Sequence, residues 1–480
     1  MAAQPLSRGP FSLRISAPMM RRLKAHLFPG DHDEHGAVIG ASVVETRRGT
    51  RLLARRLFLA ADGVDYLPGN RGYRMLTADF VRRCVLACEA EGLAYLPIHC
   101  HGGTTTVGFS TDDLDSHKRG YPALLDILDG TPVVGLVFAT DAVAGDVWLP
   151  GGGRLDLAHT DVVGRVPTRL FPSPPPSSPK ADQSHDRQAR LFGDRGQAVL
   201  RDQKVGIIGL GGAGSLLNEY LTRLGVGHIV AIDPDRVDLT NLPRLVGARR
   251  LDALPLFASK RMPALLRRFG EAHAATKVHV ARRVARQANR KVVFESVIDD
   301  ITSHEAVERL IDCDFLFLAA DTMQARLVVN ALVHQYLIPA IQVGAKVQVD
   351  KKSGAVEDVF SVVRHLTPGE GCLWCNELIN PTRLAEEAAT TEQRHAQRYV
   401  PEVVAPSVIT LNAVAASHAV DDYLFAVTGL AESDLPLRWR KFRATSDEVV
   451  IEVPRRDSDC PECHGRLGAG TTIRLPTRVE

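Results

Sequence analysis

The segment KVGIIGLGGAG, at residues 204–214, constrains the fold of this 480-residue chain more than any other. An apolar run typical of a strand leads directly into a glycine-rich turn, and a helical pattern follows at 213–224. The turn contains Gly209, Gly211, Gly212 and Gly214. Glycines allow a tight turn and a close approach of phosphate to the helix N-terminus. The segment therefore predicts a nucleotide-binding unit, and on the glycines alone ATP and NAD are equally favoured.

Further apolar strands alternate with helical patterns after this turn. They are expected at 228–233, 297–301, 314–319 and 340–343. Such runs between helices are typical of a parallel sheet that is buried on both faces. We therefore predict an α/β, Rossmann-like, doubly wound domain with a mainly parallel sheet. The first part of the chain mixes short strands (37–44, 51–59, 96–101, 133–139) with a helix at 79–91, which is an α+β pattern.

A Pro- and Ser-rich stretch at 171–184 separates these two parts. Its composition favours an extended spacer over packed structure. We predict a first domain at 1–165, a linker at 166–184 and a second domain at 185–480. A polar stretch at 386–399 is expected to form a surface helix or loop.

The residues around the glycine turn favour ATP over NAD. Asp233 ends the strand after the turn and could bind ribose, with Asp235 two residues on. Cations that could neutralise phosphate charge are Arg244 and Lys260. Asp321 follows a later strand and could hold Mg²⁺ through oxygen.

These motifs, in this order over about 185–470, resemble the ThiF/MoeB and ubiquitin-activating enzyme superfamily. The resemblance implies ATP-dependent adenylation of the C-terminal carboxylate of a ubiquitin-like or sulfur-carrier protein. It also implies that Asn241, Arg244 and Lys260 contact phosphates and that Asp321 binds Mg²⁺. Arg187, in DRQARLFG, matches the arginine that reaches into the partner subunit's site, which implies a homodimer.

Four cysteines form two CxxC pairs, Cys372/Cys375 and Cys460/Cys463. Paired CxxC motifs suit a closed, structural Cys₄ zinc site. ThiF/MoeB-like proteins carry the same feature. The other cysteines lie at 84, 88, 100 and 313, and none falls in the stretch between the two pairs. The resemblance to ubiquitin-activating enzymes implies that a catalytic cysteine would lie in a loop after the first CxxC pair. Because this chain has none there, we expect no thioester step, so that activated product passes directly to a conjugating enzyme or a sulfur donor.

The first part carries a second candidate metal site. His99 and His101 lie on one face of a predicted strand, and Asp113 follows. Two histidines and one carboxylate leave zinc an open position, as a catalytic site requires. Glu34 is the candidate general base, and Ser110 could donate a hydrogen bond to a developing oxyanion.

This pattern resembles the JAMM (MPN/JAB) metalloprotease domain over roughly residues 10–160, which implies cleavage after a ubiquitin-like protein. Two departures are Gly102, where the family has proline, and a loop to Ser110 that is one residue longer. Asp112 is an alternative ligand to Asp113. Asp33 and Glu45 are alternatives to Glu34.

The two resemblances together predict a bifunctional enzyme that processes and adenylates a ubiquitin-like protein, as expected of a bacterial ubiquitin-like system. Adenylation for thiocarboxylate formation and a nucleotide-binding scaffold with an inactive protease domain are the alternatives. Lys and Arg (58) nearly balance Asp and Glu (56), giving a net charge of +2, so no nucleic-acid partner is expected. Without a signal peptide or a long apolar run, we expect a cytoplasmic protein that has no membrane partner.

Overall fold

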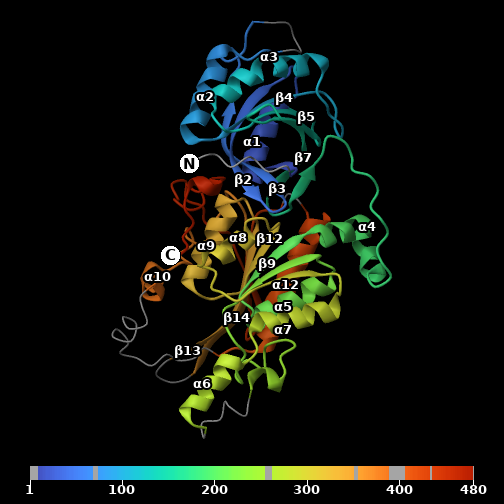
Figure 1. The fold of residues 1–480 in the computed structure, drawn as a ribbon. Coiled ribbons are helices and arrows are strands. Elements are labelled where there is room, and N and C mark those ends of the chain that lie inside the picture. The colour runs from blue at the N-terminus through green and yellow to red at the C-terminus, as the bar shows by residue number, and fades with distance from the viewer. Residues whose placement is uncertain are drawn as a thin grey trace. The chain divides into compact units, whose positions relative to one another are not determined.

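The computed structural model describes residues 9–68, 74–254, 262–350, 355–388, 406–432 and 435–478 (Figure 1). It divides into two compact units, each with its own sheet. Unit 1 is 1–177 with 334–337 and 464–474, and unit 2 is 178–333 with 338–463 and 475–480. Among the described helices, none combines the length and apolar character that a membrane crossing requires.

Unit 1 is built on an eight-stranded sheet with the order β1-β3-β2-β4-β5-β6-β7-β8. Strand β1 pairs in parallel with both β3 and β7, so the sheet closes on itself. The strands are β1 (Phe11–Ser16), β2 (Gly36–Thr46), β3 (Gly49–Leu59), β4 (Ala94–Cys100), β5 (Val133–Phe138), β6 (Val143–Trp148), β7 (Arg154–Val163) and β8 (Thr168–Leu170).

Three helices complete unit 1: α1 (Ala17–Leu27), α2 (Ala78–Glu91) and α3 (Thr111–Ile127). Helix α1 packs its buried face, including Leu23 and Leu27, into the core formed by the strands. Helix α2 buries Phe80, Cys84 and Cys88 in a second cluster, and the helix predicted at 79–91 is confirmed.

Unit 2 contains another eight-stranded sheet, with the order β11-β10-β9-β12-β13-β14-β15-β16. Pairings from β11 through β13 are parallel, and those from β13 to β16 are antiparallel. The strands are β9 (Lys204–Ile208), β10 (His228–Ile232), β11 (Val293–Val297), β12 (Phe315–Leu318), β13 (Ala340–Val349), β14 (Val356–Leu366), β15 (Trp439–Arg443) and β16 (Glu448–Glu452).

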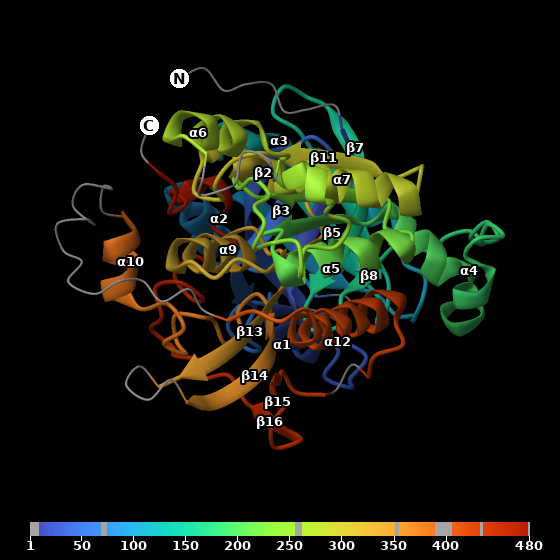
Figure 2. The same ribbon diagram turned by 90° about the horizontal axis from the view of Figure 1, so that it is seen from below.

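Helices cover both faces of this sheet, as a doubly wound fold requires. The odd-numbered residues of β9 join a core with α5, α7 and α12, and α12 lies beside α5 (Figure 2). Gly206 of β9 faces the opposite side and abuts Leu310 of α8. The helices are α4 (Asp186–Asp202), α5 (Gly212–Arg223), α6 (Ala264–His273), α7 (Lys277–Ala288), α8 (His304–Leu310), α9 (Met323–Gln335), α10 (Pro381–Ala388) and α12 (Ile409–Thr428), with short 3₁₀ turns at Arg250–Ala253 and Gly470–Thr472.

Two sequence-based expectations differ from the structure. The strand predicted at 297–301 lies at Val293–Val297, because this edge strand is largely exposed and lacks the apolar pattern of a buried one. Strand β8 falls inside the predicted linker, since it pairs with β7. The sheet is mainly parallel, as predicted, because its first five strands pair in parallel, and β14 to β16 extend it antiparallel. Of the polar stretch at 386–399, residues up to 388 belong to α10, and the rest lies outside the described residues.

Candidate functional site

The glycine turn in unit 2 lies against the backbone that follows β12. Gly209 has φ +87°, a conformation that L side chains rarely adopt, and a Cβ there would lie 2.7 Å from the Ala320 amide nitrogen. Gly214, in the first turn of α5, faces the Gly209 carbonyl so closely that a side chain has no room. The turn therefore brings the start of α5 next to Ala319 and Ala320, which follow the adjacent parallel strand and directly precede Asp321.

Asp233 holds this turn from the end of β10. Its carboxylate accepts hydrogen bonds from the backbone nitrogens of Leu210 (2.6 Å) and Asp235 (2.9 Å). Burial raises the pKa of Asp233, and the charge of Lys277 and the two backbone hydrogen bonds oppose that rise. Asp233 is thus bonded directly to the glycine turn.

Lys277 is a candidate residue that the sequence reasoning missed. It is the first residue of α7, whose N-terminus is capped by Thr276. Its ammonium lies 3.6 Å from Asp233 and 2.6 Å from Asp235. The predicted cation, Lys260, lies outside the described residues. The sequence signal was a lysine directly after a capping threonine, and only the fold brings this lysine to Asp233.

Two other predicted phosphate contacts lie in the turn after β10. Asn241 is buried, and its amide nitrogen donates to Asp238 (3.0 Å), so its side chain stabilises the turn. The Arg244 guanidinium donates to the Thr240 carbonyl (2.7 Å). A Cβ on Gly212 would lie 3.4 Å from Arg244 Cδ, which places Arg244 over the start of α5.

Asn412, near the start of α12, is a second missed residue. It is buried, and a Cβ on Gly212 would lie 3.0 Å from its Cγ. Its amide nitrogen donates to Ser407 (3.3 Å). Asn412 lies about 200 residues beyond the turn in sequence, so spacing gave no signal for it.

Asp321 is exposed and lies two residues before α9, which begins at Met323. Beside it, the Glu387 carboxylate from α10 accepts hydrogen bonds from the Met323 (3.0 Å) and Gln324 (2.9 Å) backbone nitrogens. Arg326 donates to the Leu378 carbonyl (2.8 Å). Burial lowers the pKa of Arg326, and the charges of Asp321 and Glu387 oppose this. Asp321 thus offers an accessible carboxylate near a buried guanidinium.

Arg187 is an exposed residue in the first turn of α4. The helix is interrupted at Gly193, where φ is +74°. Within the single described chain, Arg187 belongs to the surface of unit 2.

The four CxxC cysteines come together in unit 2. All are buried, and the Sγ–Sγ distances are 3.5 Å for Cys372–Cys375, 3.8 Å for Cys372–Cys460 and 3.7 Å for Cys375–Cys463. A tetrahedral zinc with Zn–S bonds of about 2.3 Å separates its sulfurs by about 3.8 Å, whereas a disulfide needs about 2.05 Å. Burial and the neighbouring thiols raise the pKa of Cys375 to about 12. The donor set fits a tetrahedral metal.

Unit 1 also brings its predicted ligands together. His99, at the end of β4, and His101, just beyond it, have Nε2 atoms 3.1 Å apart. Asp113 of α3 lies 3.3 Å from His99 and 3.5 Å from His101. Ligands of a tetrahedral zinc with bonds of about 2.0–2.1 Å are separated by about 3.3 Å. The three side chains are partly exposed (24%, 22% and 14%), which leaves a side open to solvent.

Burial would raise the pKa of Asp113, but hydrogen bonds from His99 and Ser110 outweigh it and hold the pKa well below its usual range. The Ser110 hydroxyl donates to Asp113 (2.7 Å), while its oxygen accepts from the Asp113 backbone nitrogen (3.2 Å). Ser110 is therefore the N-cap of α3, and its hydroxyl points to the Asp113 carboxylate. Asp112 is exposed and is not part of the cluster.

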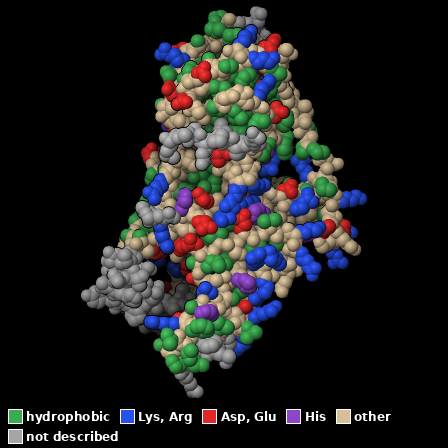
Figure 3. Space-filling view, viewed as in Figure 1, with side chains coloured by type: hydrophobic (Ala, Val, Ile, Leu, Met, Phe, Trp, Pro, Cys, Tyr) green, Lys and Arg blue, Asp and Glu red, His purple; other side chains and the backbone are tan. Residues whose placement is uncertain are grey.

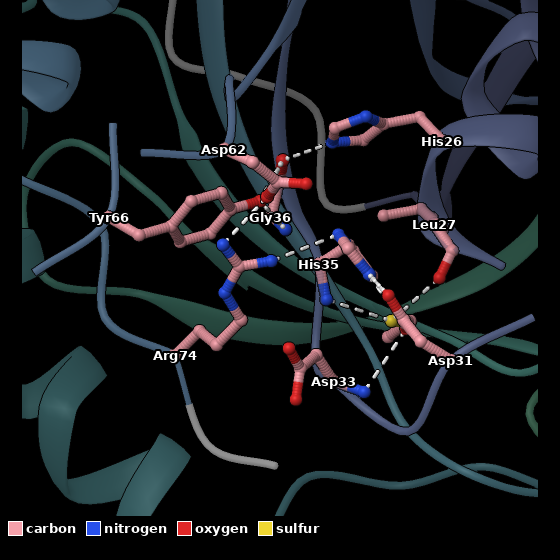
Figure 4. Close-up of polar contacts among 10 residues, drawn as sticks. His26, Leu27, Asp31, Asp33, His35, Gly36, Asp62, Tyr66 and Arg74 are labelled. Atoms are coloured by element: carbon pink, nitrogen blue, oxygen red, sulfur yellow. Dashed lines mark hydrogen bonds and ion pairs between the residues drawn. The ribbon is translucent and has the colours of Figure 1, made fainter. Parts of the chain in front are cut away.

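Glu34 lies 3.8 Å from His101 Nε2, so the predicted general base does face the cluster. Behind it, the next residue, His35, is fixed by Asp31 (3.0 Å) and by Arg74 (3.3 Å), as Figure 4 shows. The His35 backbone nitrogen donates to Cys100 Sγ (3.2 Å). These contacts hold the start of β2 and the end of β4 in place, and the sequence gave no signal for them.

The comparisons concern mainly unit 2. A model of the ThiF family matches residues 185–463, which confirms the family predicted for the second part. The chain is 31% identical over 276 residues to the sulfur carrier protein ThiS adenylyltransferase of Bacillus subtilis, covering 57% of this chain and 68% of the relative. It is 27% identical over 192 residues to ubiquitin-like modifier-activating enzyme 5 of Branchiostoma floridae, covering 37% of this chain and 39% of the relative.

The tRNA threonylcarbamoyladenosine dehydratase of Escherichia coli is 26% identical over 179 residues, covering 37% of this chain and 59% of the relative. Among solved structures, E. coli MccB with MccA-N7isoASN aligns with a TM-score of 0.44 and 17% identity, covering 60% of this chain and 75% of MccB.

Proposed function

Since the chain belongs to the ThiF family, we propose that unit 2 is an ATP-dependent adenylyltransferase that activates the C-terminal carboxylate of a ubiquitin-like or sulfur-carrier protein. The observation that carries this proposal is the convergence of Asp233, Lys277 and Arg244 on the glycine turn, with Asp321 on the neighbouring strand end. A carboxylate for ribose and cations for phosphate meet at one edge of the sheet.

In the proposed reaction, an oxygen of the substrate carboxylate attacks the α-phosphorus of ATP. The bond from that phosphorus to the bridging oxygen breaks, and pyrophosphate leaves with the electron pair. Asp233 would bind the ribose, and the N-terminus of α5 would face the phosphates. Lys277 and Arg244 would neutralise the charge that builds up on the leaving group. Asp321 would hold Mg²⁺, which neutralises phosphate charge when bound.

The relatives suggest two substrate classes. One is named for a sulfur carrier protein and another for a ubiquitin-like modifier. Both fit a small protein with a free C-terminal carboxylate. Thiocarboxylate formation is therefore the alternative outcome to conjugation, and an inactive nucleotide-binding scaffold is the third. The position of Arg187 on the unit 2 surface is compatible with the proposed homodimer.

The test is ATP–pyrophosphate exchange with the full-length chain and a small candidate protein that ends in glycine. We expect exchange only when both are present, and its loss in Asp321→Ala. Asp300→Ala, which removes a partly exposed carboxylate elsewhere in unit 2, is the matched control. Exchange that survives in Asp321→Ala would contradict the assignment of this site.

We further propose that unit 1 is a zinc-dependent peptidase that processes or deconjugates the same protein. The observation that favours it is the spacing of His99, His101 and Asp113, with Glu34 facing them. These three residues would hold the ion, which would act as a Lewis acid and lower the pKa of a bound water. Glu34 would accept a proton and return it to the leaving amine. Ser110 would keep Asp113 oriented.

Cleavage of a fusion that extends the candidate protein beyond its C-terminal glycine tests this second activity. We expect cleavage by the intact chain, loss in His101→Ala and in Glu34→Gln, and retained zinc in Glu34→Gln. Zinc analysis should give two ions per chain, the second held by the four cysteines as a structural site. Cleavage that is unchanged in both variants would refute the peptidase proposal.

A further inference from the structure

The near-neutral charge of the chain conceals one strongly basic segment. Residues 244–291 contain 13 Lys and Arg residues and two Asp and Glu residues, a net +11 within a chain of +2, so the remainder carries −9. Residues 277–291, which include all of α7, contain six basic residues and no acidic one. An average over the whole chain therefore says little about this surface.

Helix α7 separates its apolar and basic residues onto opposite faces. Val278, Val280, Ala281, Val284 and Ala285 are buried against the sheet and α5. On the outer face lie His279, Arg282 and Arg286, and the chain continues into exposed Arg290 and Lys291. Figure 3 shows Lys and Arg side chains gathered over this part of unit 2. We call Arg282, Arg286, Arg290 and Lys291 the basic face.

The basic face is poorly neutralised by the protein itself. By contrast, the neighbouring Arg283 forms a bidentate ion pair with Asp252 (2.9 and 2.7 Å). Within the described residues, Arg286 and Arg290 have no such ion pair, and the buried Arg282 Nε has no hydrogen-bond acceptor. Lys291 is 84% exposed, and the one ion pair it makes with a described residue is a long contact with Asp182 (3.7 Å).

Like charges at i and i+4, such as Arg282 and Arg286, destabilise a helix. A helix face that served only solubility could carry both positive and negative side chains, without this repulsion between like charges. The protein-interface alternative needs apolar contact area, yet none of the exposed large apolar side chains lies on α7. Regularly spaced cations suit a phosphodiester backbone, because it presents repeated negative charge.

We propose that the basic face of α7 binds the phosphate backbone of a nucleic acid. This interaction does not depend on either activity proposed above. It replaces the expectation, drawn from the net charge, that the chain has no nucleic-acid partner. Successive arginines at i and i+4 are about 6 Å apart along the helix axis, so the face offers a short row of phosphate contacts.

The test is fluorescence anisotropy of full-length protein with a labelled 30-nucleotide single-stranded RNA and a 30-base-pair DNA duplex, from 50 to 200 mM salt. The variant Arg286→Gln/Arg290→Gln/Lys291→Gln removes three charges from the basic face. Arg22→Gln/Arg82→Gln/Arg119→Gln removes three from exposed positions of unit 1 and is the matched control. Thermal unfolding checks that each variant is folded.

We expect binding of at least one probe in the range of about 10⁻⁴–10⁻⁶ M or tighter. The basic-face variant should bind roughly tenfold more weakly at 100 mM salt, and its slope of log affinity against log salt should fall by about two for RNA. The unit 1 control should stay within about twofold of the natural protein. No binding at 50 mM salt, or equal loss in both variants, would overturn the proposal. Displacement of RNA by polyglutamate at equal charge concentration would also overturn it, in favour of an acidic protein partner.

Discussion

Replacing Gly214 by alanine tests the close contact inside the nucleotide turn. An added Cβ would lie 2.8 Å from the Gly209 carbonyl carbon and still closer to its oxygen, and 3.4 Å from the Ala319 Cβ. The first two are backbone atoms, so no side chain can rotate away. Overpacking costs about 1–3 kcal/mol, and alanine regains up to about 1 kcal/mol of helix propensity over glycine. We therefore expect Gly214→Ala to destabilise unit 2 by about 2 kcal/mol.

Gly211→Ala is the matched control, because a Cβ at Gly211 would have no atom within 4 Å and the backbone there has φ −71°. Urea unfolding followed by circular dichroism measures both variants, with the transition of each unit fitted separately. Gly211→Ala should remain within about 0.5 kcal/mol of the natural protein. ATP–pyrophosphate exchange should fall much further in Gly214→Ala. Equal stability of the two variants would refute the described path of the turn.

Three other changes probe separate parts of the chain. Lys277→Met should reduce exchange at least about 100-fold while unit 2 stays folded, as measured by initial rates and thermal unfolding. Burial would raise the pKa of Asp146, but hydrogen bonds from His117, Arg154 and Trp148 lower it to about 2. Asp146→Asn should therefore cost about 2 kcal/mol above pH 4, and the difference should vanish as the pH falls through 2, as urea unfolding at several pH values would record. Cys375→Ser should remove one zinc ion per chain by metal analysis and lower the unfolding temperature of unit 2.

The order of strands and helices around the glycine turn could be predicted because each is a buried apolar run or an amphipathic helix. The edge strand at Val293–Val297 could not, since its exposed residues lack that pattern. The sequence reasoning also missed site residues that lie far from the glycine turn in the sequence. Lys277 and Asn412 reach the site only through the packing of α7 and α12, which no local spacing encodes.

In unit 1, the grouping of His99, His101 and Asp113 could be predicted because strand alternation places the two histidines on one face and the Ser-x-x-Asp pattern follows soon after them. The closure of the sheet through β1 and β7 could not, since their pairing joins residues about 145 positions apart. The same holds for Arg74, which fixes His35 from a distant loop. Groups of functional residues that lie close together in the sequence could therefore be predicted. The contacts with distant residues that hold them in place could not.

Adenylation of a small protein by unit 2, as proposed here, would be visible in the mass of that protein. The candidate is incubated with the chain, ATP and Mg²⁺, and its mass is measured before the product can hydrolyse. We expect a gain of one adenylyl group that persists with His101→Ala and disappears with Lys277→Met. An adduct that forms equally well with Lys277→Met, or no adduct with any carboxyl-terminal glycine protein, would contradict it.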